Sequence, residues 1–217
     1  MMGQMKWLTI ETSTERGSVA LVEGDEVLGE EVFVSERGHN AAIFEPLGRL
    51  LEGADGELGG IVVGTGPGSY GGVRVGIAVA TGLSLAKAVP IFGVPSLLGA
   101  DEVEGDDYVV VGDARRGSFF VAEVKGRRTA GEAELLEAAA FVERVRGLSG
   151  EGWEVVTFDG RELPVDGDVV SKRFPSAGVL GRVTAAMGGV EREKLAEEAL
   201  QPIYLRAPYI TEAKGVR

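Results

Sequence analysis

The segment from Ile61 to Ala88 constrains the fold most, because it joins a strand, a glycine-rich loop and a helix without a break. The apolar run Ile61-Val62-Val63, flanked by glycine, predicts a buried strand. The next nine residues, GTGPGSYGG, include five glycines. From about Val73 to Ala88 the pattern is helical. A strand, a glycine loop and a helix in this order can present backbone N–H groups and a helix N-terminus to an anion.

The loop completes neither of the common phosphate-binding fingerprints. It lacks the G-x-x-x-x-G-K-[ST] pattern of the NTPase type, and Ser69 stands where G-x-G-x-x-G requires its last glycine. Two interpretations stay open. The glycines satisfy the backbone geometry of a tight strand-to-helix turn, or the loop contacts a ligand or a partner.

Two helices of this chain are more apolar than surface helices usually are. The helix from Val73 to Ala88 has small residues four apart along one side, and its other positions are also apolar. The small residues are Gly72, Gly76, Ala80, Ser84 and Ala88. A second helical pattern runs from about Asn40 to Glu52, and Pro46 either kinks it or begins its regular part. Side by side, the two helices form half of a bundle that a second subunit would complete.

The remaining patterns predict a duplicated α/β fold. Three strands in a meander precede the Asn40–Glu52 helix, and a short strand follows the Val73–Ala88 helix. The strands are Trp7–Ile10, Val19–Val22, Val27–Val34 and Ile91–Val94. After an acidic linker, residues 101–107, the triplet Arg116-Gly117-Ser118 repeats Arg16-Gly17-Ser18, with apolar strands on both sides. The later elements are a helix Ala138–Arg146, a strand Glu154–Phe158, a helix Ser176–Met187 and a tail Gln201–Ile210 that packs along the second domain.

We therefore predict two tandem ribonuclease-H-like domains of the actin, Hsp70 and sugar-kinase type, the second one reduced. Residues 1–100 form the N-terminal domain, with the glycine-rich loop and the two apolar helices. Residues 101–217 form the C-terminal domain.

Composition excludes several classes of site and partner. The 217 residues include no cysteine and one histidine, so disulfides, thiolate chemistry and two-histidine metal sites are excluded. The net charge of −12 disfavours binding of RNA or DNA by the chain alone, since such binding depends on Lys and Arg at phosphates. No run approaches the roughly 20 apolar residues of a membrane span. We expect a cytoplasmic protein without a membrane partner.

Five stretches together resemble the bacterial TsaB (YeaZ) family: WLTIETST, GTGPGSYGGVRVGIAVATGL, IFGVPSL, GDARRG and PIYLR. The resemblance implies a dimerization subunit for the synthesis of threonylcarbamoyladenosine, next to the anticodon of tRNA. It implies a catalytic partner of the TsaD type and an associated ATPase of the TsaE type, and it allows a homodimer. The chain itself would require no cofactor, and ATP or ADP would belong at the partner interface. The expected interface residues are Ala41, Ala42, Phe44, Glu45, Val73, Gly76, Ile77, Ala80 and Ser84.

The same resemblance supplies an enzyme hypothesis, because the catalytic TsaD type shares the glycine block. That type binds a metal through an H-x-x-x-H pair and an aspartate. Here the sole histidine is His39, and Ile43 stands four residues further on. A metallopeptidase-like site of that kind is therefore impossible in this chain, and we expect no metal site. His39 is interpreted as a helix-start or interface residue.

A second alternative is a nucleotide-binding, ATPase-like or kinase-like enzyme of the same fold. Glu11 and Asp113 each end the first strand of a half, where a carboxylate facing a cleft can position Mg²⁺ or activate water. We favour carboxylates that cap turns or face solvent, because Arg74 is the one basic residue near the glycine loop. The scaffold hypothesis, without catalytic residues, is therefore the stronger one. The residues expected nearest to a nucleotide are Glu11, Thr12, Ser13, Gly66, Gly68, Ser69 and Asp113.

Overall fold

The first of two mixed β-sheets has the strand order β3-β2-β1-β4-β5 in the computed structural model, which describes residues 5–34, 40–52 and 57–205. β1 (Lys6–Glu11), β2 (Arg16–Glu23) and β3 (Glu26–Val34) form the antiparallel meander that the sequence predicts. β4 (Leu58–Gly64) pairs parallel with β1, and β5 (Ile91–Val94) pairs parallel with β4. The alternation of side chains along β1 gives the sheet two buried faces.

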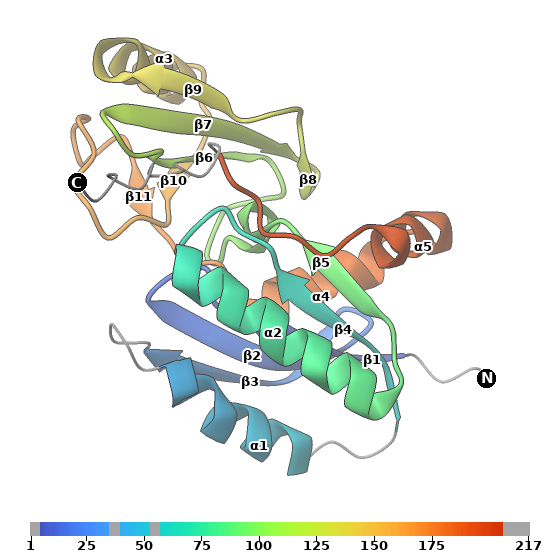
Figure 1. The fold of residues 1–217 in the computed structure, drawn as a ribbon. Coiled ribbons are helices and arrows are strands. Elements are labelled where there is room, and N and C mark those ends of the chain that lie inside the picture. The colour runs from blue at the N-terminus through green and yellow to red at the C-terminus, as the bar shows by residue number, and fades with distance from the viewer. Residues whose placement is uncertain (1–4, 35–39, 53–56, 206–217) are drawn as a thin grey trace, which may run out of the picture.

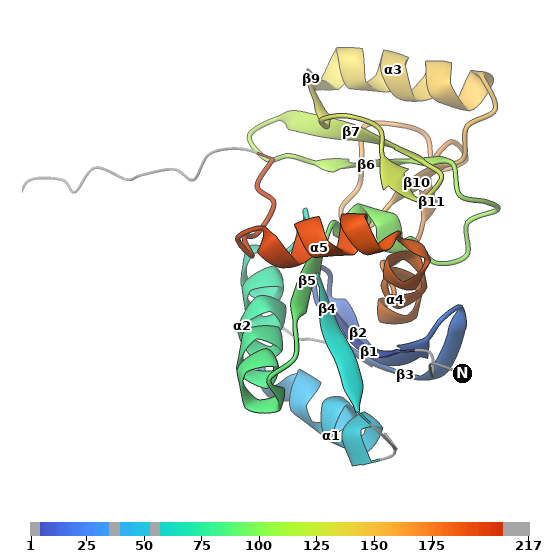
Figure 2. The same cartoon turned by 90° about the vertical axis from the view of Figure 1, so that its right-hand side faces the viewer.

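Helices cover both faces of this first sheet (Figures 1 and 2). A 3₁₀ turn, η1 (Asn40–Ile43), leads into α1 (Phe44–Glu52), which shares one face with α2 (Tyr70–Lys87). Leu8 and Ile10 of β1 point into the core on this side. α4 (Ala177–Ala186) packs on the opposite face, against β1 and β2.

The second sheet repeats the strand order of the first. β6 (Tyr108–Asp113) pairs antiparallel with β7 (Ser118–Lys125) and parallel with β10 (Val155–Thr157), which pairs with β11 (Ser171–Lys172). β8 (Arg128–Thr129) and β9 (Glu134–Glu137) both pair with β7, and α3 (Ala138–Gly150) packs on this sheet. An antiparallel meander followed by parallel strands in both halves confirms the predicted α/β fold of two ribonuclease-H-like units.

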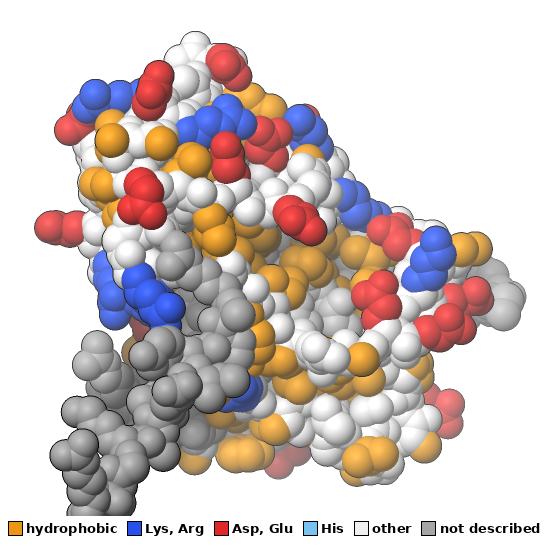
Figure 3. Space-filling view, turned by 45° about the horizontal axis from the view of Figure 1, so that its top comes forward, with side chains coloured by type: hydrophobic (Ala, Val, Ile, Leu, Met, Phe, Trp, Pro, Cys, Tyr) orange, Lys and Arg blue, Asp and Glu red, His pale blue; other side chains and the backbone are white. Residues whose placement is uncertain are grey.

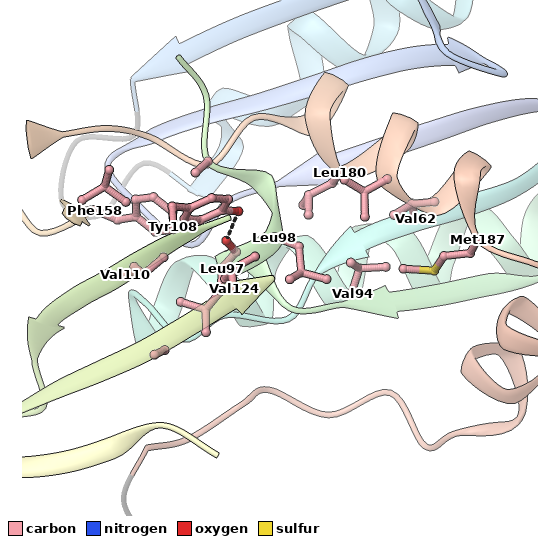
Figure 4. Close-up of a cluster of buried hydrophobic side chains, with 14 of the residues drawn as sticks. Val62, Val94, Leu97, Leu98, Tyr108, Val110, Val124, Phe158, Leu180 and Met187 are labelled. Atoms are coloured by element: carbon pink, nitrogen blue, oxygen red, sulfur yellow. Dashed lines mark hydrogen bonds between the residues drawn. The ribbon is translucent and has the colours of Figure 1, made fainter. Parts of the chain in front are cut away.

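One core cluster joins the two sheets. It includes Val62 and Val94 of the first sheet, Tyr108 and Val110 of the second, and Leu180 of α4 (Figure 4). Between the sheets the chain forms a 3₁₀ turn, η2 (Ser96–Gly99), whose Leu97 carbonyl oxygen accepts a 2.7 Å hydrogen bond from the Tyr108 hydroxyl. This buried contact ties the connection to the core of the second sheet.

The last helices of the chain return to the first sheet. α4 covers its inner face, and α5 (Gly189–Glu197) packs against β5 (Figure 2). The predicted boundary at residue 100 falls between the two sheets, whereas these two helices of the predicted C-terminal domain lie on the N-terminal sheet. None of the described helices combines the length and the apolar composition needed to cross a membrane.

The helices begin where local chemistry favours a helix start. α2 begins three residues before the predicted Val73, because the Ser69 hydroxyl caps it and accepts a 3.3 Å hydrogen bond from the Gly72 N–H. Pro46 lies in the first turn of α1, where a missing N–H costs least, so it begins the regular helix. His39 and the tail beyond Leu205 lie outside the described residues.

Candidate functional site

A cleft of about 870 Å³ lies between the two sheets. The turn after β1, η1 and the glycine loop line one side, and the ends of β6 and β10 line the other. The C-terminal segment around Tyr204 forms a further wall. The structure brings five of the predicted nucleotide-proximal residues to this cleft: Thr12, Ser13, Gly68, Ser69 and Asp113.

The glycine loop is bonded tightly to the turn after β1. The Ser69 N–H donates to the Ser13 carbonyl oxygen at 2.6 Å, and the Thr12 hydroxyl donates to the Gly72 carbonyl oxygen at 2.8 Å. A Cβ atom at Gly68 or Gly72 would collide with the carbonyl oxygens of this turn. Glycine is therefore required here by the close approach of two backbones. The Ser69 and Gly72 N–H groups at the start of α2 already donate hydrogen bonds within the chain.

Two predicted nucleotide-proximal residues lie outside the lining of the cleft. Glu11 is fully buried, and its Oε1 accepts a 2.5 Å hydrogen bond from the Ser13 N–H. Burial raises the pKa of Glu11. Gly66 has a positive φ of 90°, and its N–H donates to the Ser96 hydroxyl at 3.0 Å. Neither residue is in the lining of the cleft, and the proximity of Glu11 and Gly66 to a nucleotide stays a prediction.

Asp113 does lie in the cleft, where arginines neutralise it. Its Oδ2 is 3.2 Å from Arg115 Nη1 and 3.0 Å from Arg161 Nη1, and its Oδ1 accepts a 2.7 Å hydrogen bond from the Arg115 N–H. Asp159 accepts a 2.6 Å hydrogen bond from the Asp113 N–H. Burial, with the adjacent negative Asp113, raises the pKa of Asp159. Sequence reasoning missed Arg161 and Asp159, which follow β10 and reach Asp113 only because β10 pairs with β6.

An aromatic and arginine stack stands at the mouth of the cleft. The Arg74 guanidinium lies 3.5 Å from the ring centre of Tyr70, and the rings of Tyr70 and Tyr204 are 5.9 Å apart. The Ile203 N–H donates to the Thr65 carbonyl oxygen at 2.8 Å, so the C-terminal segment crosses the glycine loop of the first half, whereas the prediction placed it along the second domain. This contact brings the distant PIYL and GSYGGVR stretches together.

The ridge of small residues on α2 packs on the chain's own sheet. Val73, Gly76 and Ala80 are buried, and a Cβ atom at Gly76 would collide with Thr12 Oγ1. These three residues are therefore not on an exposed interface, which corrects the prediction. The Ser84 hydroxyl bonds the Val89 carbonyl oxygen at 2.6 Å within the end of the helix. The close approach that the ridge permits is made within this chain.

The exposed interface candidates are on the outer sides of the helices. Ala41, Phe44 and Glu45 are exposed, while Ala42 and Ile77 are partly buried. The outer face of α2 carries small and apolar residues at helical spacing: Gly71, Ala78, Gly82 and Leu85. Leu85 is 79% exposed and Phe44 is 59% exposed. In Figure 3 charged side chains gather over the upper part of the molecule and along its sides, and the described central lower part presents mainly hydrophobic and uncharged groups.

Within the described ranges, no group of three or more His, Cys, Asp or Glu side chains is arranged to hold a metal ion. Asp113 and Asp159 are adjacent, and Arg115 and Arg161 stand beside them. This cluster of carboxylates and guanidiniums is a network of ion pairs.

Comparison with known proteins gives consistent matches along the chain. A family model described as TsaD, tRNA N6-adenosine threonylcarbamoyltransferase, matches residues 27–159. The tRNA threonylcarbamoyladenosine biosynthesis protein TsaB of Escherichia coli is 32% identical over 224 residues, covering 93% of this chain and 95% of the relative. The TsaB protein of Bacillus subtilis is 27% identical, covering 93% and 94%.

Solved structures show the same fold. YeaZ from Pseudomonas aeruginosa superposes with a TM-score of 0.67 at 22% identity, covering 92% of this chain and 99% of that one. A second Pseudomonas aeruginosa structure, described as similar to peptidase YeaZ, has a TM-score of 0.68 at 24% identity, covering 93% and 100%. With the near-complete sequence matches above, the chain belongs to the TsaB (YeaZ) family of tRNA threonylcarbamoyladenosine biosynthesis proteins.

Proposed function

We propose that this chain is a non-catalytic scaffold subunit that pairs, through the outer faces of α1 and α2, with a catalytic subunit of the TsaD type. The pair would act in threonylcarbamoyl transfer to the adenosine next to the anticodon of tRNA. The observation that carries the proposal is the exposed apolar outer face of α2, with Leu85 79% exposed, on a helix whose inner face is already packed. Exposed apolar surface of this kind is typical of protein interaction sites.

The shape of this face suits close helix packing. Gly71, Ala78 and Gly82 leave little side chain between the α2 backbone and a neighbour. Helices that meet through small residues can approach closely, and the large side chains at the edge, Leu85 and Phe44, would fill the groove beside them. A four-helix contact from two such pairs of helices would follow.

The family match supports a partner of similar fold. Residues 27–159 match the TsaD family model, and this range contains both α1 and α2. Two subunits of like fold can pair through equivalent surfaces about an approximate two-fold axis. The same geometry allows a homodimer of this chain, in competition with the heterodimer.

The carboxylates support a role without catalysis. Glu11 has no exposed surface, and Asp113 is held by Arg115 and Arg161 at 3.2 and 3.0 Å. We propose that catalysis and tRNA binding belong to the TsaD-type partner, and ATP hydrolysis to an ATPase of the TsaE type. The charge of −12 supports this division. The proposal places the assembly in the cytoplasm.

A nucleotide in the cleft is the second candidate, and the size of the cleft favours it. The cleft has a volume of about 870 Å³ and is lined in part by Thr12, Ser13 and Ser69, and this volume is large enough for a nucleotide. The residues of the cleft fit the phosphates of a nucleotide poorly. The Ser69 N–H already donates to the Ser13 carbonyl oxygen, and the Asp113 carboxylate is already paired with two arginines. We therefore propose that ATP or ADP binds only at the interface with the partner, beside the start of α2. Calorimetric titration of ADP into the chain alone and into the pair tests this.

The interface is tested by Ala78→Arg and Leu85→Arg, with Val190→Arg as the matched control. All three positions are exposed on helices, and Val190 is 69% exposed on α5. A charge buried without a partner costs about 3–5 kcal/mol, so the two α2 variants should bind the TsaD-type subunit at least about a hundredfold more weakly. Their melting temperatures should match that of Val190→Arg.

Sedimentation of the mixed subunits and a tRNA modification assay give the readout. The proposal expects folded α2 variants that neither pair with nor support the catalytic subunit, and a control that does both. Full pairing and activity of Ala78→Arg and Leu85→Arg would place the interface elsewhere.

A further inference from the structure

Glu11 is a fully buried carboxylic acid at the end of β1. Its side chain has no exposed surface, and its Oε2 finds no hydrogen-bond partner among the residues that the structure describes. A buried carboxylate without a cation is unfavourable by many kcal/mol, and the group usually remains protonated instead. The mechanism proposed above makes no use of this acid.

Two serines flank the carboxyl group. The Ser13 N–H donates to Glu11 Oε1 at 2.5 Å. On the other side, a Cβ atom at Gly64 would collide with Glu11 Oε2 and lie 2.7 Å from Ser96 Oγ, so Oε2 and this hydroxyl occupy neighbouring positions. Glycine at position 64 makes room for the acid at the end of β4.

Within the described part of the chain, the elements around Glu11 bring no cation to it. β4, residues 65–69 of the loop and η2 carry no titratable side chain. On β1 and β2, Lys6 and Glu23 lie at the opposite end of the strands. The other charged groups nearby have partners of their own: Arg16 with Asp101 at 3.0 Å, Glu15 with Lys172 at 3.3 Å, and Arg74 over Tyr70 at 3.5 Å. Burial therefore raises the pKa of Glu11, and the hydrogen bond from the Ser13 N–H only partly opposes the rise.

We propose that Glu11 is a positioning residue that acts as an uncharged acid and holds the glycine loop and the start of α2 in place. The loop has two anchors. The Gly66 N–H donates to Ser96 Oγ at 3.0 Å, and the Ser69 N–H donates to the Ser13 carbonyl oxygen at 2.6 Å. Both anchoring serines lie against the carboxyl group of Glu11.

Ionisation of Glu11 would act on both anchors at once. Ser69 caps α2, and Tyr70 and Arg74 in its first two turns form the stack at the mouth of the cleft. The glycine loop and the exposed start of α2 are thus both held in place by contacts with the buried Glu11 carboxyl group. A negative charge there would favour opening of the loop, because water would then reach the carboxylate.

The sign of the pH dependence follows from this state. The ordinary pKa of a glutamate is 4.5, and the folded protein holds the proton of Glu11 above that pH. The contribution of protonated Glu11 to the free energy of unfolding is therefore complete below pH 4.5. It is lost as the pH rises through the raised pKa of the folded state. Over that interval the unfolding equilibrium constant gains about a factor of ten per pH unit from this one group.

The test compares the wild type with Glu11→Gln in urea denaturation between pH 5 and pH 8.5. Glutamine keeps the size and hydrogen-bonding groups of the neutral acid but has no proton to lose. The wild-type unfolding constant should rise relative to that of Glu11→Gln by about tenfold per pH unit up to the raised pKa. Glu132→Gln, which removes an exposed carboxylate in a loop, should leave the pH dependence unchanged.

A carbon-13 carboxyl titration of Glu11 in the wild type gives a second, direct readout. The expected carboxyl shift stays that of the protonated acid above pH 4.5, where an ordinary glutamate ionises. A carboxyl group that titrates at or below the ordinary pKa of 4.5, or a Glu11→Gln variant destabilised equally at every pH, would overturn the proposal. If Glu11→Gln does not fold, the titration alone decides. Neither measurement depends on the partner subunit.

Discussion

The Thr12 hydroxyl donates to the Gly72 carbonyl oxygen at 2.8 Å and joins two residues 60 positions apart in the chain. Thr12 follows β1, and Gly72 lies in the first turn of α2. The same threonine fills the space where Gly76 would carry a Cβ atom. The glycines of this block thus serve the packing of the helix onto its own strand. The surface left for a partner is the opposite side of α2.

Gly76→Ala should destabilise the protein although alanine favours helices. The new methyl group would collide with the Oγ1 atom of Thr12, just after β1, and force the helix or the threonine to move. Overpacking of this kind costs about 1–3 kcal/mol. Gly82→Ala is the matched control, because its Cβ atom would meet nothing within 4 Å. That substitution should stabilise the helix by about 0.5–1 kcal/mol. Urea denaturation of both variants measures the contrast, and equal stabilities would contradict it.

Tyr108→Phe should weaken the connection between the two sheets. The Tyr108 hydroxyl donates to the Leu97 carbonyl oxygen in the shared core, and its loss leaves that acceptor unpaired at a cost of about 1–3 kcal/mol. Burial raises the pKa of Tyr108 to about 12. The folded state therefore retains this proton more strongly than the unfolded chain, and the stabilisation is lost as the pH rises from 10 toward 12.

Tyr108→Phe cannot show this alkaline loss. Denaturation of the wild type and of Tyr108→Phe at pH 8 and pH 11 checks the prediction. The difference between their free energies of unfolding should be smaller at pH 11 than at pH 8. An equal difference at both pH values would mean that the hydroxyl titrates normally.

The strands and long helices could be predicted because their periodicity is local. β1 to β5 and α2 follow from runs of apolar residues bounded by glycine and proline. α5 has no such signal, since none of its residues is buried, and the sequence analysis missed it. β9 pairs with β7 across a connection that includes β8, which local patterns do not reveal. Short strands of this kind depend on the tertiary neighbours.

The site shows where sequence reasoning stops. Glu11 and Asp113 occupy equivalent strand ends, and each carboxylate accepts the N–H two residues later, at 2.5 and 2.7 Å. Their surroundings differ because Glu11 meets Gly64 and Asp113 meets Arg161. Spacing alone did not distinguish the buried acid from the exposed ion pair. For the same reason, the ridge on α2 predicted close packing without indicating against which surface.

The Asp113→Asn substitution distinguishes the scaffold hypothesis from the enzyme hypothesis. The partners of Asp113, Arg115 and Arg161, are 56% and 59% exposed, so the ion pairs should contribute less than about 1 kcal/mol. We expect an unchanged fold and tRNA modification at close to the wild-type rate when the TsaD-type subunit is present. Loss of a catalytic acid or base lowers rates by about a hundredfold or more. A loss of that size, with pairing intact, would support the enzyme alternative.

The last prediction concerns tRNA and the arginines at the cleft. Arg115 and Arg161 are the obvious candidates for phosphate contacts, yet both are engaged by Asp113, and the chain as a whole carries −12. Each contact to a phosphate must compete with that ion pair and with the repulsion of the whole chain. The chain alone should therefore give no saturable binding of tRNA at physiological salt, measured by fluorescence anisotropy. Saturable binding that weakens steeply with salt and disappears in Arg161→Gln would show that the cleft contacts RNA directly.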